Sequence, residues 1–365
     1  MTTDDRRGEM TFELVKTLTE LPGPTGHEDA VQDWLATRWG TFSPEVRRTP
    51  VGNVLARVGG EGERLLLAAH ADEICLMIKS ITDEGFLHLA LYAADPTGHP
   101  PRWFNPINQP ALVLGGHAPV EGFFATASGH VVGGRHATQD KVHWNDWFVE
   151  IGARSRAEVE ELGIHPGCRA IWNPPTRRVG RRLITGKAMD DRVVLAVATL
   201  AAERLAGRDD LRYEVWLAST VQEENGLIGA ASIVDSLPVD LCLTFDVGLT
   251  GDIPGPDERD FPSKLGGGPI IVYQDNSCHY SRRLSNDLVR LARGAGIPVQ
   301  QAIFANYGSD GASLIRRGVE AALVTCPTRY THSPVETVDE ADVEACVDLL
   351  VAFVTAPKDA SDRSS

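Results

Sequence analysis

The spacing of hydrophobic residues divides the chain into three parts, and the first part is α/β in pattern. At residues 10–21, and again from about 27 to 39, apolar side chains recur three or four positions apart, which predicts two amphipathic helices. Apolar runs at residues 52–58 and 64–69 predict strands, and the unbroken hydrophobicity of the second indicates burial on both faces. We interpret residues 1–74 as the first part of a catalytic α/β domain.

The middle of the chain, residues 75–182, has a different pattern. Short alternating segments are separated by glycine and proline, which is typical of a small all-β module. Four of the seven tryptophans lie in this range, Trp103, Trp144, Trp147 and Trp172. Large aromatic side chains can fill a small barrel or form a subunit contact. We interpret this range as an inserted β-barrel-like domain, and we predict that it mediates assembly into a homo-oligomer.

The third part returns to alternating helices and strands. The pattern predicts a helix at 191–205, strands at 213–221, 241–245, 270–273 and 321–326, and helices near 281–295 and 341–354. Such alternation predicts a mainly parallel sheet covered by helices on both faces. Residues 183–356 therefore complete the domain that residues 1–74 begin, and the polar tail at 357–365 is predicted to be disordered.

Composition and charge restrict the partners. The formal charge of −15 argues against nucleic acid, because affinity for phosphates depends on lysine and arginine. No apolar run approaches the ~20 residues that span a bilayer, so we expect no membrane partner. The first residues lack the apolar region of a secretion signal, which favours the cytoplasm. The six cysteines form no C-x-x-C pair and are predicted to be reduced.

Polar residues follow several predicted strands at the point where each strand ends. In open parallel sheets, ligands gather beyond the carboxyl ends of the strands. The chain carries metal-competent side chains at these positions and at the entry of the helix at 191–205, namely His70, Asp72, Asp190, Asp191, Glu223, Glu224, Asp246 and His332. We expect them to converge on one edge of the sheet.

Each of these residues alone has an ordinary explanation. Asp190 could cap a helix, and Asp246 could form a turn with its own backbone. Together they favour metal, because burying several carboxylates without cations costs several kcal/mol per ion. Carboxylate and imidazole ligands without thiolate suit zinc first, or cobalt or manganese, and the set is large enough for two ions. Spacing does not distinguish Asp190 from Asp191 as a shared ligand, nor Glu223 from Glu224 as the free acid.

Five motifs in this order resemble the family of the tetrahedral and glutamyl aminopeptidases. They are His-Ala-Asp-Glu-Ile at 70–74, Gly-Lys-Ala-Met-Asp-Asp-Arg at 186–192, Val-Gln-Glu-Glu-Asn-Gly at 221–226, Phe-Asp-Val at 245–247 and Pro-Thr-Arg-Tyr-Thr-His-Ser-Pro at 327–334. The resemblance covers nearly the whole chain. It implies an α/β catalytic domain interrupted by a small β domain. The small domain would mediate assembly into a homo-oligomer whose size lies between a dimer and a dodecamer.

The resemblance also implies a role for each site residue. Asp190 would bridge two divalent ions, with Glu223 as the general base and Asp72 behind a ligand histidine. The remaining ligands would be His70 and Asp246 on one ion and Glu224 and His332 on the other. Three residues depart from the family pattern without removing a ligand, namely Ala71, Cys75 and Asn225.

The leading hypothesis is a metal-dependent aminopeptidase that removes N-terminal residues from short peptides through a metal-activated water at a co-catalytic two-metal site. One alternative keeps the site and changes the substrate, giving a metal-dependent amidohydrolase that deacylates acylated amino acids or small amides. Another alternative, from a different class, is a catalytically weak oligomeric peptide-binding subunit. Because Glu223 and every ligand are present, the sequence favours the enzymes.

Overall fold

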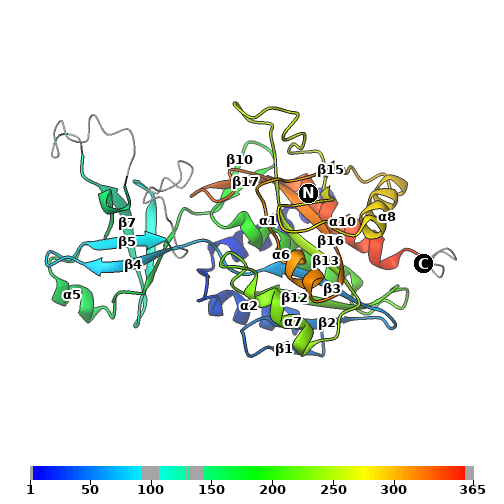
Figure 1. The fold of residues 1–365 in the computed structure, drawn as a ribbon, viewed down its shortest axis with the longest axis horizontal. Coiled ribbons are helices and arrows are strands. Elements are labelled where there is room, and N and C mark those ends of the chain that lie inside the picture. The colour runs from blue at the N-terminus through cyan, green and yellow to red at the C-terminus, as the bar shows by residue number, and fades with distance from the viewer. Residues whose placement is uncertain (1–2, 92–106, 129, 131–142, 358–365) are drawn as a thin grey trace. The chain divides into compact units, whose positions relative to one another are not determined.

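The chain divides into two compact units, seen in a computed structural model that describes residues 3–91, 107–128, 130 and 143–357 (Figure 1). The first unit comprises Met1–Asp72, Thr176–Thr331 and Glu336–Ser365, and the second comprises Glu73–Pro175 with His332–Val335. The first contains a large mixed sheet with helices, and the second contains a barrel. The predicted fold class, an α/β domain interrupted by a small β domain, is confirmed.

The first unit contains most of the regular elements. Its strands are β1 (Val46–Arg48), β2 (Val54–Gly59), β3 (Arg64–His70), β10 (Arg177–Val179), β11 (Leu183–Gly186), β12 (Glu214–Thr220), β13 (Leu241–Leu249), β14 (Ile270–Val272), β15 (Gln300–Ala302), β16 (Glu320–Arg329) and β17 (Glu336–Asp339). Its helices are α1 (Thr3–Glu20), α2 (Asp29–Trp39), α6 (Met189–Leu205), α7 (Ile228–Ser236), α8 (Arg282–Gly294), α9 (Gly311–Arg316) and α10 (Glu340–Thr355).

Within the described residues, eleven strands form one sheet in the order β1-β2-β12-β3-β13-β16-β17-β11-β10, with β14 on β16 and β15 on β14. The four neighbours β12, β3, β13 and β16 run parallel, whereas the flanking strands on that path pair antiparallel. Thr220 of β12 lies opposite His70, and Thr244 of β13 lies opposite Ala68. The parallel strands therefore end at the same edge of the sheet.

Helices cover both faces of this sheet, and β3 shows how. Successive side chains of a strand point to opposite faces. Leu65 and Leu67 are fully buried in a core that contains residues of α1, α2, α6, α8 and α10. Leu66 and Ala68 are buried in a second core with residues of α7 and α9. The continuous apolar run at 64–69 thus reflects burial on both faces, as its pattern predicts.

The second unit is a closed barrel. Its elements are β4 (Leu76–Ile81), β5 (Leu87–Leu91), β6 (Pro110–Leu114), β7 (Pro119–Thr126), the 3-10 helix η2 (Trp144–Asp146), β8 (Trp147–Glu150), α5 (Arg156–Glu161) and β9 (Arg169–Trp172). In the part of the unit that is described, the strands close in the order β4-β5-β8-β7-β6-β9. Trp147 and Trp172 are buried in its core, so they fill the barrel. Trp103 lies outside the described residues.

Strand β10 lies within the range expected for the insertion, but it belongs to the large sheet. It pairs antiparallel with β11, with Arg177 opposite Thr185. Arg178, also in β10, makes ion pairs with Glu9 and Glu340, which anchors the strand to α1 and α10. Short strands at the edge of the large sheet and strands of a barrel share the same alternating pattern, so the sequence did not separate them. Of the predicted tail, only Pro357 lies within the described residues.

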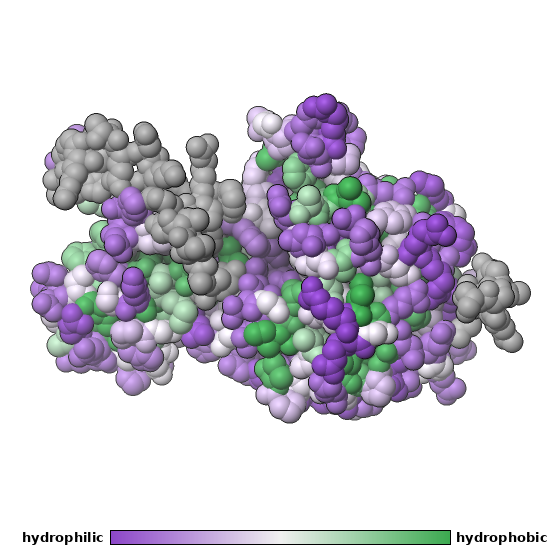
Figure 2. Space-filling view, in the orientation of Figure 1, coloured by the Kyte–Doolittle hydropathy of each residue, from purple (hydrophilic) through white to green (hydrophobic). Residues whose placement is uncertain are grey.

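The visible surface of the first unit mixes polar and apolar side chains. Figure 2 shows hydrophobic residues in separate patches between hydrophilic ones. Scattered exposed apolar side chains are ordinary on folded domains. None of the described helices combines the length and the apolar character needed to cross a bilayer.

Truncating a side chain at the centre of the large sheet should destabilise the first unit. Leu67 is fully buried and lies opposite Leu217 and Leu243 on the neighbouring parallel strands. We expect Leu67→Ala to lower the free energy of unfolding by about 2–5 kcal/mol, because it leaves a cavity that the packed sheet cannot fill. The matched control is Leu162→Ala, because Leu162 is 39% exposed. Urea unfolding monitored by tryptophan fluorescence measures both, and equal effects would contradict this account of the core.

Candidate metal centre

The ends of the parallel strands bring the first predicted ligands together. His70 is the last residue of β3, and Asp246 lies in β13 opposite Thr325 of β16. Because Thr244 pairs with Ala68, His70 and Asp246 each lie two residues further along neighbouring strands. Side chains two residues apart on a strand share a face. His70 and Asp246 are therefore presented on the same side of the sheet, and both are buried.

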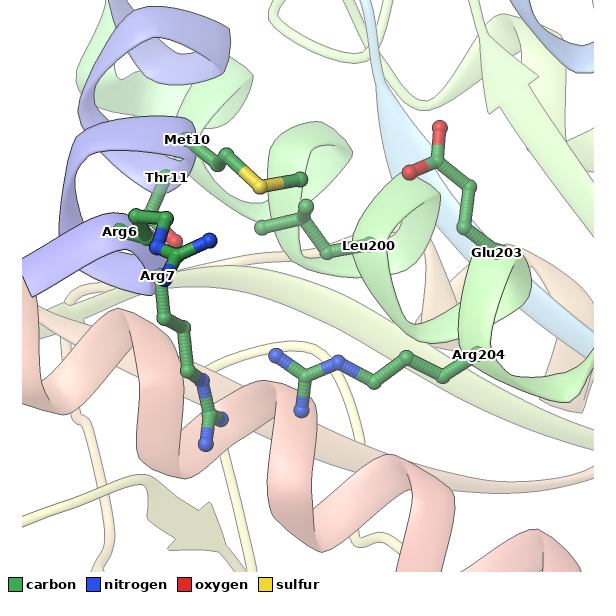
Figure 3. A pocket seen from close by; sticks show the side chains of 7 residues that line it. All are labelled: Arg6, Arg7, Met10, Thr11, Leu200, Glu203 and Arg204. Atoms are coloured by element: carbon green, nitrogen blue, oxygen red, sulfur yellow. The ribbon is translucent and has the colours of Figure 1, made fainter. Parts of the chain in front are cut away.

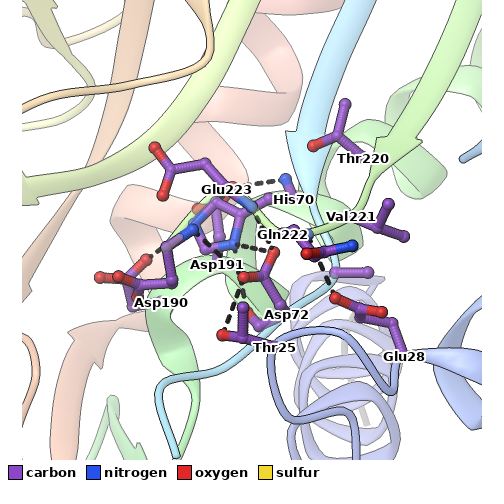
Figure 4. Close-up of polar contacts among 12 residues, drawn as sticks. Thr25, Glu28, His70, Asp72, Asp190, Asp191, Thr220, Val221, Gln222 and Glu223 are labelled. Atoms are coloured by element: carbon purple, nitrogen blue, oxygen red, sulfur yellow. Dashed lines mark hydrogen bonds and ion pairs between the residues drawn. The ribbon is translucent and has the colours of Figure 1, made fainter. Parts of the chain in front are cut away.

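The start of α6 contributes the next two carboxylates. Asp190 and Asp191 have non-helical backbone angles, so they precede the regular part of the helix. The Asp190 amide donates to Glu336 Oε2 at 2.9 Å, and Asp190 Oδ1 lies 3.1 Å from His70 Nε2 (Figure 4). His70, Asp190, Asp191 and Asp246 are all buried, and each offers a ligand atom within 4.8 Å of the others.

A second group of possible ligands shares one residue with the first. Asp190, Glu224 and His332 offer ligand atoms within 4.8 Å of one another, and Glu224 and His332 are partly exposed. The five residues expected as ligands thus fall into two groups with Asp190 in common. Their individual roles stay predictions. Asp191 joins the first group as well, and its only signal in the sequence is the adjacent pair of aspartates.

The Asp72 carboxylate holds the backbone of the two glutamates. Its Oδ1 accepts the Glu223 amide at 2.9 Å, and its Oδ2 accepts the Glu224 amide at 3.2 Å. Thr25 Oγ1 also donates to Asp72 Oδ2, at 3.1 Å (Figure 4). The expected bond from His70 Nδ1 is less direct, since this nitrogen lies 3.1 Å from the Asp72 backbone carbonyl and 3.5 Å from the carboxylate. The role of Asp72 toward His70 stays a prediction.

Arg192 ties the strand end to the N-terminal segment. This fully buried arginine donates from Nε to the Ala71 carbonyl at 2.6 Å, and from Nη1 to the Leu18 carbonyl at 2.8 Å. Its Nη2 donates to the Gly23 carbonyl at 3.3 Å. A Cβ atom at Gly23 would come within 2.4 Å of that nitrogen, so glycine permits the approach. The turn between His70 and Asp72 is thereby fixed to α6 and to the segment after α1.

Burial and mutual repulsion raise the pKa values of the clustered acids. Burial, and next the charge of Asp190, raise the pKa of the Asp246 carboxyl to about 8. Burial is also the main cause that raises the pKa of Asp191 and of Glu223 well above their usual range. Burial alone would lower the pKa of His70, but the neighbouring carboxylates, Asp191 first, outweigh it and raise that pKa. Protons therefore compensate the charge when no metal cation is bound.

The residues fit divalent metal ions. Asp191 Oδ1 is buried and makes no hydrogen bond to any described residue, so a buried oxygen in the cluster lacks a donor. The possible ligands are carboxylates and imidazoles, and none of the described cysteines belongs to either group. This set matches the ligand preferences of zinc, and also those of cobalt and manganese. Cations would also balance the negative charge that otherwise requires protons.

Two further polar residues near the cluster were not identified as site residues from the sequence. Asp310 is buried and accepts the Thr220 hydroxyl at 2.5 Å, and its other oxygen makes no bond to the described residues. Burial raises the pKa of Asp310 to about 6. Tyr307 donates its hydroxyl to the Val247 carbonyl at 2.8 Å, next to Asp246. The signal for Asp310 was the Gly-Ser-Asp-Gly run at 308–311, whereas Tyr307 carried none.

A separate pocket of about 490 Å³ lies between α1 and the second half of α6 (Figure 3). Its lining is Arg6, Arg7, Met10, Thr11, Leu200, Glu203 and Arg204. Arg7 and Arg204 both pair with Glu344 and Asp348 of α10, so their charges are already balanced. Leu200 lies ten residues after Asp190 along α6, which corresponds to roughly 15 Å of helix. The pocket is therefore distinct from the metal-ligand cluster.

Known proteins are similar to this chain in sequence and fold. Residues 52–349 match the model of the M42 glutamyl aminopeptidase family. A putative aminopeptidase of Acetivibrio thermocellus is 30% identical over 350 residues, which cover 94% of this chain and 98% of that protein. The structure of an aminopeptidase from the archaeon Desulfurococcus kamchatkensis superposes with a TM-score of 0.88 at 30% identity over 96% of each chain.

A third comparison concerns a protein of known assembly. The TET1 peptidase of Pyrococcus horikoshii, which can assemble into a tetrahedron or a large octahedral shell, has a TM-score of 0.83 and 27% identity, covering 95% of this chain and all of that one. These matches extend over nearly the full length of the chain, and they agree with the resemblance seen in its five motifs. The chain belongs to the M42 glutamyl aminopeptidase family, and it is a metal-dependent aminopeptidase.

Proposed function

We propose that this aminopeptidase removes N-terminal residues from short peptides at a site that holds two divalent ions. The proposal rests on two groups of possible ligands that have Asp190 in common. The first group is buried, and the second is partly exposed. Asp190 would contact both ions, and zinc fits the ligands best, with cobalt or manganese as substitutes. The remaining ligands would be His70 and Asp246 on one ion, and Glu224 and His332 on the other. Bound ions would supply Lewis acidity, which lowers the pKa of water and polarises a carbonyl.

Glu223 is the residue that would move the proton. Its amide is held by Asp72, and its carboxyl group interacts electrostatically with His70 and Asp246 of the first ligand group. Burial raises the pKa of the Glu223 carboxyl above its usual range, which favours its use as a general base. Glu223 would accept a proton from the attacking water on a carboxylate oxygen and deliver it to the amine that leaves. Asp72 would keep Glu223 in place through the backbone.

We further propose that the chain forms a homo-oligomer through its barrel unit. A solved relative at 27% identity, the TET1 peptidase of Pyrococcus horikoshii, can assemble into a tetrahedron or a large octahedral shell. In the barrel, Phe123 of β7 is 49% exposed although it is a large apolar residue. Exposed aromatic side chains are suited to subunit contacts.

Metal binding should release protons. The pKa values of His70, Asp191, Glu223 and Asp246 are raised in the metal-free chain, and ligands bind metal in their deprotonated form. Because protons compete with the metal below these pKa values, we expect zinc affinity to rise with pH through about 8, the pKa of Asp246. Calorimetry in two buffers of different ionisation enthalpy counts the protons. Asp246→Asn should release fewer, and binding at pH 7 without proton release would contradict the proposed ligands.

Replacing the two adjacent glutamates should have different effects. We expect Glu223→Gln to lower kcat by roughly 10²–10⁴-fold with unchanged metal content, because it removes only the general base. Glu224→Gln should instead bind less metal at the same free zinc concentration, because it removes a ligand. The measurements are hydrolysis of an aminoacyl p-nitroanilide panel and metal content per chain by mass spectrometry.

The same assay separates the proposed substrate from the alternatives. Parallel reactions use N-acetylated amino acids and N-acetylated peptides, which lack a free amino terminus. Aminopeptidase activity requires release from the free-amine substrates only, with loss on chelation and recovery with zinc or cobalt. Hydrolysis restricted to the acylated compounds would replace the proposal with a deacylase, and no release by the metal-loaded protein would contradict it.

The oligomer is tested by mass in solution. We expect light scattering to give a multiple of the 39.5 kDa chain mass. Phe123→Glu should shift the distribution toward smaller species, because it introduces a charge into an apolar contact. An exposed residue outside the barrel, as in Val51→Glu, is the control. A monomer mass for the unaltered protein would contradict the proposal.

A further inference from the structure

Four successive backbone amides leading into the glutamate pair are each held by a buried side chain. The Val221 amide donates to Asn53 Oδ1 at 3.1 Å, and the Gln222 amide donates to Glu28 Oε1 at 3.1 Å. The next two amides donate to the two oxygens of Asp72, as described above. Asn53, Glu28 and Asp72 are at most 6% exposed. The amides at 221–224 are therefore held by side chains from other elements, while the Val221 and Gln222 carbonyls accept amides at the start of α7.

Glu28, like Asp72, makes a second contact through the oxygen that accepts one of these amides. Its Oε1 also accepts the Gly26 amide at 2.6 Å, so one carboxylate oxygen joins the segment before α2 to the segment after β12. Figure 4 shows Glu28 beside Gln222. The Asn53 side chain also binds α7, because its nitrogen donates to the Gly229 carbonyl at 2.8 Å. The Glu28 carboxylate thus links the segment before α2 to the backbone beside Glu223.

The position of Glu28 at the start of α2 also indicates that its side chain serves to hold the backbone beside Glu223. Glu28 is the N-cap residue of α2, yet its side chain makes no capping hydrogen bond and turns to Gln222 instead. One helical turn later, Gln32 is fully buried and donates to the Ser219 carbonyl at 3.0 Å. Residues four apart lie on the same helix face. Two side chains of one face of α2 thus bind the end of β12 and the segment that follows it.

The backbone at Gln222 needs such support. Gln222 has a φ of +52°, in the left-handed region that residues with a Cβ seldom adopt. A residue held in this region persists when its surroundings over-determine it, and such residues cluster at functional sites. The Glu28 bond to the Gln222 amide restrains this residue directly, together with the bond that its carbonyl accepts from the Ile228 amide at 3.2 Å. Gln222 is the residue immediately before Glu223 in the chain.

We propose that Glu28 is a positioning residue that holds the backbone of Gln222 and, through it, sets the direction of the Glu223 carboxylate. The role requires an acceptor oxygen at the place of Oε1 and does not require negative charge. Glutamine can supply that oxygen, whereas alanine removes it and aspartate withdraws it by one methylene. The functional part of this inference rests on the proposed role of Glu223, but the structural part does not.

The test compares three variants of Glu28 with a neighbour. Asp29→Ala is the matched control, because Asp29 begins the same helix and its side chain, 65% exposed, pairs with Arg48 on the surface. Hydrogen exchange of the peptide that contains residues 221–224 is measured on the full-length, metal-free protein. We expect Glu28→Ala and Glu28→Asp to speed exchange there by at least about tenfold, and Glu28→Gln and Asp29→Ala to leave it as in the unaltered protein.

The second readout is steady-state kinetics with zinc at saturation and metal content measured. We expect Glu28→Ala to lower kcat by roughly 10²-fold, because a small displacement of a catalytic group has an effect of this size. KM should change less than about threefold, and Glu28→Gln should restore kcat. Unchanged exchange in Glu28→Ala, or equal losses in Glu28→Gln and Glu28→Ala, would overturn the inference. If the unaltered enzyme were inactive, the proposed function would fail while the exchange result still decided the role of Glu28.

Discussion

The charge of several carboxylates that lie close together and out of water is the constraint on which this site depends. Asp190, Asp191 and Asp246 offer ligand atoms within 4.8 Å of one another and of His70. Like charges at such distances repel strongly where water is excluded, so the cluster requires protons or cations. In the metal-free chain the pKa values of Asp191 and Asp246 are raised, so these carboxyl groups hold their protons more tightly. The electrostatic repulsion among the carboxylates, which bound protons reduce, also favours the binding of divalent ions.

The rest of the first unit places this charge and keeps it in place. Four parallel strands end at one edge of the sheet. The strand ends therefore bring together residues that are far apart in the sequence. Arg192 fixes the turn after β3 by donating to the Ala71 carbonyl, and Asp72 in that turn holds the amides of Glu223 and Glu224. Asp72 binds the backbone amides of the two glutamates, which leaves the Glu223 carboxylate available for the proton transfer that we propose.

The fold and most of the cluster could be predicted from the sequence for a physical reason. Hydrophobic periodicity reports burial, and polar residues at the carboxyl ends of parallel strands must share an edge, which is why His70 and Asp246 were expected together. The contacts of Glu28 and Asp72 could not be predicted in this form. They depend on loop backbone conformation, such as the positive φ of Gln222, which no periodicity records. The edge strand β10 was placed in the insertion because short strands of either sheet share one pattern.

The central claim is that Asp190 joins two metal ions within the ligands described. Anomalous diffraction from zinc-loaded crystals, recorded on both sides of the zinc absorption edge, tests it most directly. We expect two anomalous peaks per chain, one next to His70 and Asp246 and the other next to Glu224 and His332, with the Asp190 carboxylate contacting both. A single peak, or peaks that His70 and Asp190 do not contact, would contradict it.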